Sequence, residues 1–269
     1  MDSSNTIGHS HAGILYPSDI EELRGAVRLA LSDERFSLPA AALIPHGSYR
    51  HILPVLKTTF SYIQNCKPKR IVLIGKAQRD VFGTDFSPVF ITTKSDRYST
   101  PMGNIAIDYQ SISEAIANTA LCDDSYFHED TVLEPILPFI ASTFTEIPVI
   151  PVLVIPTDDV EHHVQALFNT IERSFRDVLY ILSANISNYT ESESALSQAK
   201  AAIASMQSES PYAHVSDEYS ILRAVRTKKP WTLLSLRSSY GRTSFTDRSN
   251  ILNNNIREIW YAGAVKEMT

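Results

Sequence analysis

The sequence predicts an α/β fold: a single layered domain with a largely parallel sheet flanked by helices. Short apolar segments alternate with amphipathic segments of helical spacing along nearly all of the 269 residues, as in strand–helix–strand units. Several apolar segments are continuous runs of branched residues, as expected for parallel strands buried on both faces, and "RIVLIG" at 70–75 is the clearest. No linker-like composition or repeat breaks this pattern. Residues 1–269 are therefore expected to form one domain, with 1–11 as a flexible leader.

Strands are predicted where the apolar runs are short and bounded by proline, glycine or polar residues. They cover residues 41–44, 70–75, 87–93, 104–108, 147–155, 177–184, 231–239 and, as the last one, 256–265. The segment "KSDRYSTPMG" at 94–103 lies between two of them and is expected to be a loop.

Helices are predicted where apolar residues recur every three or four positions. They cover residues 17–33, 52–65, 111–121, 130–144, 158–175, 192–206 and 216–227. Ser18 and Glu21 form a capping box for the first helix, and Asp158 is expected to open the fifth. Pro54 is tolerable only in the first turn of the second helix, and two prolines should shorten or kink the fourth.

The composition excludes several classes of function. The net charge is −6, and the 24 basic residues are scattered, so the chain lacks the basic face that nucleic-acid binding needs. The longest nearly continuous apolar run, 147–156, is too short to span a bilayer, so membrane insertion is not expected. Cys66 and Cys122 are far apart and form no metal-ligand or CxxC pattern, which suits a reducing, cytoplasmic compartment.

The candidate site follows from the fold class, because ligands of open α/β sheets bind beyond the carboxyl ends of the strands. Four polar loops follow predicted strands. Their polar members are His46, Ser48, Tyr49, Lys76, Gln78, Arg79, Asn185, Ser187, Asn188, Tyr189, Tyr240 and Arg242. A catalytic metal usually takes three ligands from His, Asp, Glu and Cys, and only His46 qualifies here. Ser48, two residues from His46, is interpreted as a turn hydroxyl.

Seven segments occur in an order that matches a known family: "AGILYP", "IPHGSYRH", "VLIGKAQ", "YSTPMGNIAID", "HEDTVLEPILPF", "IPVLV" and "ILSANISNY". From about Ala12 to Ala264, the chain resembles the Memo family, whose bacterial and archaeal members are called AmmeMemoRadiSam system protein B. The Memo fold is similar to that of the class III extradiol ring-cleaving dioxygenases, which are non-haem iron enzymes. The resemblance therefore implies an α/β sheet with a pocket at its strand ends.

The resemblance also implies that most of the family's metal ligands are replaced. Where the family has "PHAGY", this chain has "PHGSY" and keeps the first histidine as His46. "GPSH" has become "GKAQ", which places Gln78 at the second histidine. "SSDFSHY" has become "SANISNY", which places Asn185 at the aspartate and Asn188 at the third histidine, with Tyr189 kept. A cysteine of some members falls on Gly241. Neutral amide oxygens are weak ligands for iron, copper or zinc.

A second stretch of the family pattern is altered in the same way. Asp130 and Thr131 fall on the family's Glu-His pair, while Glu134 and the following "LPF" are kept. His128 does not restore the missing histidine without a shift in register.

Three hypotheses follow. The first is a non-catalytic binding or interaction protein that uses the inherited pocket for an unknown protein or small-molecule ligand and needs no cofactor. The second is a metal-dependent redox enzyme similar to the dioxygenases, with an altered ligand set such as His46, His128 and Glu134. The third is a metal-free enzyme in which His46 acts as a base with Asn185 and Asn188 as hydrogen-bond donors. Whether the chain is an enzyme stays open, and the first hypothesis is preferred.

Overall fold

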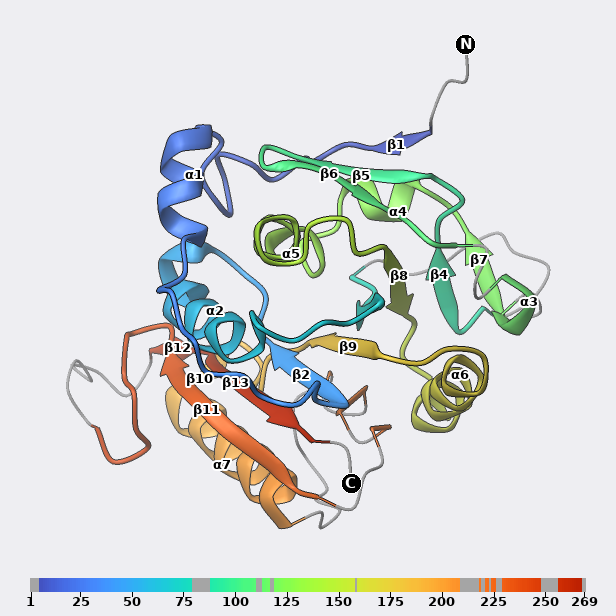
Figure 1. Ribbon diagram of the computed structural model, residues 1–269. Coiled ribbons are helices and arrows are strands. Elements are labelled where there is room, and N and C mark those ends of the chain that lie inside the picture. The colour runs from blue at the N-terminus through green and yellow to red at the C-terminus, as the bar shows by residue number, and fades with distance from the viewer. Residues whose placement is uncertain are drawn as a thin grey trace.

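The computed structural model confirms the α/β fold (Figure 1). It describes residues 5–78, 88–109, 113–116, 119–157, 159–208, 218, 221–222, 224–225, 229–247 and 256–267. In this part of the chain, the main sheet has eight strands in the order β11-β13-β2-β9-β3-β8-β4-β7. These are β11 (Trp231–Ser238), β13 (Trp260–Lys266), β2 (Ala41–Ile44), β9 (Val178–Ser183), β3 (Arg70–Lys76), β8 (Val149–Val154), β4 (Phe90–Thr92) and β7 (Ala120–Cys122).

The centre of this sheet is parallel, as predicted. Strands β2, β9, β3 and β8 pair in parallel, whereas β13 is antiparallel to β2 and β4 is antiparallel to β8. All residues of β2, β8 and β9 are buried, which is why their sequences are apolar without alternation.

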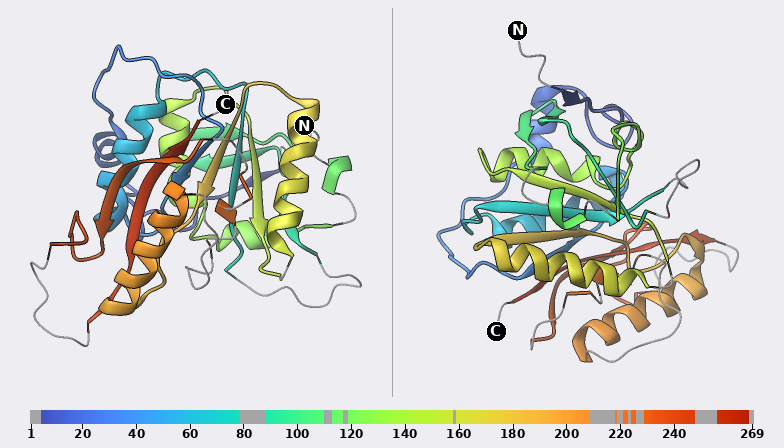
Figure 2. Two further views of the ribbon diagram at one scale, coloured as in Figure 1. Left: turned by 90° about the horizontal axis from the view of Figure 1, so that it is seen from below. Right: turned by 90° about the vertical axis from the view of Figure 1, so that its right-hand side faces the viewer.

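Helices cover both faces of the sheet, and alternate strand residues belong to two cores. Leu43 and Leu182 pack in one core with α6 (Val160–Ser174) and α7 (Ser192–Ser208). Ile44 and Ile181 pack in the other core with α1 (Ile20–Val27), α2 (Tyr49–Ile63) and α5 (Leu137–Thr143). Figure 2 shows the sheet between these two helical layers. No helix among the described residues is long and apolar enough to cross a membrane.

A small second sheet corrects two expectations. Residues 94–103, expected to be a loop, include β5 (Arg97–Thr100), which forms a hairpin with β6 (Gly103–Ala106) on the far side of α5 from the main sheet (Figure 1). Strand β1 (Thr6–Ile7) pairs with β5, so the expected flexible leader is wrong for residues 5–11. Ile7 is fully buried, and this burial helps to hold the segment.

The remaining elements are short. They are α3 (Ser113–Ile116), α4 (Ser125–His128), the 3-10 helix η1 (Glu134–Ile136), β10 (Thr190–Glu191) and β12 (Arg257–Glu258). The two-stranded sheet β10–β12 is antiparallel. The helix predicted over 130–144 is divided into η1 and α5, as its prolines suggested. The helix predicted at 216–227 lies mostly outside the described residues.

Two predicted helix starts differ in detail. Asp19, not Ser18, caps α1, and its carboxylate accepts from the Glu22 N–H at 2.8 Å. A carboxylate there also interacts favourably with the helix dipole, which the Ser18 hydroxyl cannot do. Asp158, expected to open α6, lies outside the described residues. Pro54 lies beyond the first turn of α2 but is exposed, so water can solvate the carbonyl that its missing N–H leaves unbonded.

Candidate functional site

The carboxyl ends of β2, β9 and β3 meet at one edge of the sheet, and their register places the candidate loops side by side. Ile44 and Gly75 both pair with Ser183, so these three residues form one row across the strands. His46 lies two residues beyond this row on β2, and Asn185 lies two residues beyond it on β9. The predicted meeting of these loops at one sheet edge therefore holds for the strands that carry them.

His46 is the centre of this edge and is 8% exposed. Its Nδ1 lies 3.1 Å from Ser183 Oγ, and its Nε2 lies 3.2 Å from Asn185 Nδ2. The same Nε2 lies 3.4 Å from a carboxylate oxygen of Glu218. Both ring nitrogens thus face partners within the protein.

The hydrogen bonds decide where the imidazole carries its protons. The Ser183 hydroxyl donates to the Val132 carbonyl at 2.7 Å, so its oxygen accepts from His46 Nδ1, which must carry a proton. The variable proton is the one on Nε2. When present, it points toward Glu218; when absent, Nε2 accepts from the Asn185 amide.

The charges around this histidine favour the protonated form. Burial lowers the pKa of His46, but Glu218 and, more weakly, Asp130 raise it above its ordinary value. Burial raises the pKa of Glu218, but His46 and the backbone N–H of Asn185 lower it below its ordinary value. Lys76 lowers both pKa values. The result is an imidazolium–carboxylate pair beside a lysine.

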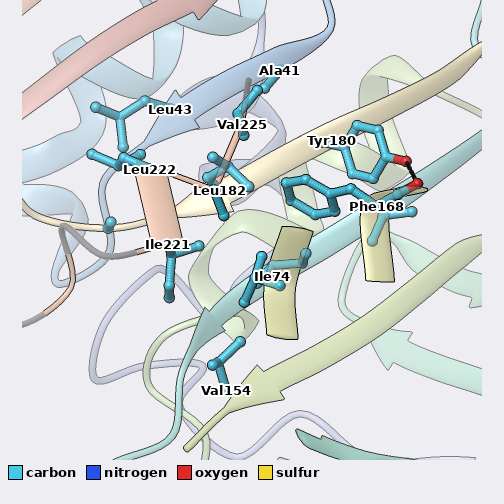
Figure 3. Packing of buried hydrophobic residues seen from close by; sticks show 14 of the residues in the cluster. Ala41, Leu43, Ile74, Val154, Phe168, Tyr180, Leu182, Ile221, Leu222 and Val225 are labelled. Atoms are coloured by element: carbon cyan, nitrogen blue, oxygen red, sulfur yellow. Dashed lines mark hydrogen bonds between the residues drawn. The ribbon is translucent and has the colours of Figure 1, made fainter. Parts of the chain in front are cut away.

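Glu218 belongs to the site although sequence reasoning did not place it there. It lies just before a short segment whose Ile221 and Leu222 are buried in the same core as the strands. Figure 3 shows Leu222 beside Leu43 and Leu182. The amphipathic pattern of 216–227 could have predicted this packing. That pattern carried no signal that Glu218 within it would reach His46.

Other predicted site residues lie at the same edge but are not in contact with His46 through any described hydrogen bond or ion pair. Gln78, two residues beyond the end of β3, is exposed. The backbone N–H of Asn188 donates to Gln198 at 2.8 Å, which ties its loop to α7. Tyr189 is 59% exposed, with the Arg257 guanidinium 5.5 Å from its ring centre. The structure thus brings His46 and Asn185 together and leaves these three at the rim.

Gly241 and Arg242 follow β11, two strands away from β2. Gly241 has a positive φ of 83°, which suits the tight turn closed by its N–H and the Ser238 carbonyl. Arg242 turns inward and forms a buried ion pair with Glu258, with its guanidinium over the Trp260 ring. These contacts stabilise the loop and leave Gly241 outside the cluster around His46.

The altered ligand set His46, His128 and Glu134 is wrong, because the structure does not assemble it. His128 is exposed on α4. Glu134 is buried, and its carboxylate accepts from the N–H groups of Ser10 and His11 and from the Tyr16 hydroxyl. Its oxygens are therefore occupied by the N-terminal segment.

Asp130, which aligns with the family's Glu-His pair, also has a structural position. Its buried carboxylate accepts from the N–H groups of Val132 at 2.9 Å, Leu133 at 2.8 Å and Glu134 at 3.2 Å. Burial raises its pKa to about 6, although these three hydrogen bonds oppose the rise. Asp130 therefore fixes the turn that packs over the end of β3.

The described cavities lie elsewhere. One of about 530 Å³ is bounded by residues 13–18, by the exposed side of α1 and by the start of α2. None of these cavities, which are formed by described residues, is lined by His46, Asn185 or Glu218.

Comparisons with known proteins agree with the resemblance noted above. The family model described as "Memo-like protein" matches residues 8–227. The chain is 25% identical to a MEMO1 family protein of Thermotoga neapolitana, over 69% of this chain and 71% of the relative. It is 26% identical to one of Aquifex aeolicus, over 73% and 72%, and 23% identical to one of Ignicoccus hospitalis, over 66% and 67%.

Among solved structures, the uncharacterized protein JW3007 of Escherichia coli K12 aligns with a TM-score of 0.49 and 12% identity, covering 82% of this chain and 98% of that one. The family model spans well over half of the chain. This chain belongs to the Memo-like protein family.

Proposed function

We propose that this protein is a non-catalytic member of the Memo family that binds a ligand or partner at the sheet edge around His46. The observation that carries the proposal is the state of His46. Its Nδ1 is bonded to Ser183, and its Nε2 faces Asn185 and Glu218. A histidine whose two nitrogens are held in this way is positioned as part of a fixed polar cluster, not as an open ligand or base.

The donor set does not fit the metal that the family implies. A catalytic metal takes three good donors and leaves one position open. Within the described residues, no group of three or more His, Cys, Asp or Glu side chains is arranged to hold a metal ion. A metal at His46 Nε2 would have to displace the Asn185 amide and would find one carboxylate, Glu218, beside it.

One observation favours the second candidate, a metal-dependent redox enzyme. Glu218 supplies a carboxylate next to a histidine, which is part of the two-histidine, one-carboxylate ligand set of non-haem iron enzymes. Among the described residues that set lacks its second histidine, because Gln78 stands at the family position and is exposed. The binding role is therefore preferred.

Metal titration distinguishes the two candidates. Protein purified without an affinity tag should bind iron(II), copper and zinc weakly at most in calorimetric titrations. The double variant Gln78→His, Asn188→His should bind orders of magnitude more tightly, because it restores imidazoles at the family's two ligand positions, on the same sheet edge as His46. The control variant Gln207→His, Asn169→His changes exposed residues on α7 and α6 and should not bind more tightly.

Tight stoichiometric binding by the unmodified protein, lost in His46→Ala, would refute the non-catalytic assignment. The single-domain organisation, the cytoplasmic location, the absence of nucleic-acid binding and the likeness to the extradiol dioxygenase fold stay predictions within this proposal.

A further inference from the structure

The Glu218 carboxylate faces hydrogen-bond donors at two strand ends, and the positive charge of a lysine at a third strand end also acts on it. Its Oε2 accepts from the backbone N–H of Asn185 at 2.7 Å, after β9. Its Oε1 lies 3.4 Å from His46 Nε2, after β2. Lys76, at the end of β3, adds a positive charge that acts on both members of this pair. We call His46, Lys76 and Asn185 the carboxylate cradle.

We propose that the carboxylate cradle is a binding site for a small carboxylate anion, and that Glu218 occupies it as a built-in stand-in for that ligand. This inference rests on the proposed binding function and names its ligand class. Each oxygen of the Glu218 carboxylate faces its own donor, which is how proteins recognise a planar two-oxygen anion.

The donors and the carboxylate belong to separate parts of the structure. The cradle is built on the paired strands β2, β9 and β3, which do not depend on Glu218 for their position. The carboxylate belongs to Glu218, which comes 142 residues after Lys76 in the sequence. Removing Glu218 would therefore leave the donors in place with an excess of positive charge.

The cradle and Glu218 are both close to the molecular surface without being fully enclosed. His46 is 8% exposed, and the side chain of Glu218 is 13% exposed. The second buried acid near His46 is Asp130, whose carboxylate already accepts from the N–H groups of Val132, Leu133 and Glu134. Asp130 thus cannot replace Glu218 as the partner of the cradle, whereas a carboxylate from solution can.

Rescue by added carboxylates tests this. Glu218→Ala should have a lower melting temperature than the unmodified protein, and acetate or formate should raise it saturably, with at least tenfold tighter binding than to the unmodified protein. Acetamide, which has the same shape without the charge, and sodium chloride should not raise it. Inorganic phosphate should bind more weakly than acetate, because a tetrahedral anion does not match the two donors. Adding Lys76→Met to Glu218→Ala should abolish the rescue.

Two further variants keep the test decisive. Glu218→Gln keeps an oxygen for the Asn185 N–H and should fold if Glu218→Ala does not; its acetate affinity should lie between those of Glu218→Ala and the unmodified protein. The control Glu267→Ala removes a partly exposed carboxylate that pairs with Lys229, and acetate should not rescue it. Acetate and acetamide acting equally, or acetate failing with both Glu218 variants, would overturn the carboxylate assignment.

Failure of this inference can be told apart from failure of the proposed function. If the unmodified protein binds metal weakly and the Glu218 variants ignore carboxylates, only the ligand class is wrong. If the unmodified protein binds metal tightly through His46, the binding function itself is wrong, whatever acetate does.

Discussion

Replacing Glu134 with glutamine should release the N-terminal segment while the main sheet stays folded. The Glu134 carboxylate accepts from the Ser10 N–H at 3.0 Å, the His11 N–H at 2.7 Å and the Tyr16 hydroxyl at 2.7 Å, and it lies 2.9 Å from His11 Nδ1. Burial and the bond to Glu134 both raise the pKa of Tyr16, so its hydroxyl keeps the proton that it donates. These contacts therefore attach the N-terminal segment to the buried Glu134 carboxylate.

The magnitude follows from the bonds that the amide cannot make. With its amide oxygen at the Oε1 position, glutamine keeps the His11 N–H and Tyr16 contacts as neutral hydrogen bonds. Its NH₂ group then faces the Ser10 N–H and the Nδ1 of His11, where the second carboxylate oxygen was. Hydrogen bonds to a charged group contribute roughly 1.5–3 kcal/mol each, and the variant regains part of this because it no longer buries a charge. A net loss of roughly 2–4 kcal/mol is expected for the attachment of residues 5–16.

Hydrogen exchange measured residue by residue is the suitable assay. Amides of residues 6–16 should lose protection in Glu134→Gln, whereas amides of β3 and β9 should keep most of theirs, because the N-terminal segment is not part of the main sheet. The same change at the exposed Glu146 serves as the control and should leave both regions unchanged. Unchanged protection of residues 6–16 in Glu134→Gln would refute the reasoning.

Two more predictions concern the turn that Asp130 fixes over β3. Gly75→Ala should lower the free energy of unfolding in urea by ~1–3 kcal/mol, because the added Cβ would overlap Val132 and lie 2.9 Å from Leu133 Cδ2. The control Gly8→Ala should be neutral, because a Cβ at Gly8 would point into open space. Equal effects of the two variants on the free energy of unfolding would contradict this. Burial raises the pKa of Asp130 to about 6, compared with 3.8 for an ordinary aspartate. The protonated side chain therefore stabilises the fold below about pH 4. Up to ~3 kcal/mol of this contribution is lost as the pH rises to about 6. Asp130→Asn should therefore gain up to that amount relative to the unmodified protein between pH 4 and pH 7 in unfolding titrations, and parallel pH curves would show that Asp130 is not the source.

Much of the main sheet could be predicted from the sequence because its strands are buried on both faces. Such strands read as continuous apolar runs, as in 70–75 and 177–184, and the helices between them have a clear spacing. The hairpin of β5 and β6 could not be predicted in the same way. Its residues alternate between buried and exposed with charged and polar side chains, so 94–103 read as a loop.

The same distinction applies to the residues of the candidate site. His46 and Asn185 could be predicted, because each directly follows an apolar strand and the fold class places strand ends together. Glu218 could not, because its position depends on a distant segment packing against Leu43 and Leu182. The anchoring of the N-terminal segment was missed for a similar reason. Its partner, Glu134, lies about 124 residues away in the sequence.

The place of β13 in the sheet has a consequence for how the chain folds during synthesis. It is the last strand along the described part of the chain, yet it lies between β11 and β2 and pairs with both. Until it emerges from the ribosome, β2 has an unpaired edge, and closing the loop of more than 200 residues between Leu43 and Ala264 carries a large entropic cost. The pairing of β2 with β9 and β3 can form earlier, so the sheet should assemble from its parallel centre and be completed last at this junction. A newly made chain is therefore most exposed to wrong pairing with other chains along β2.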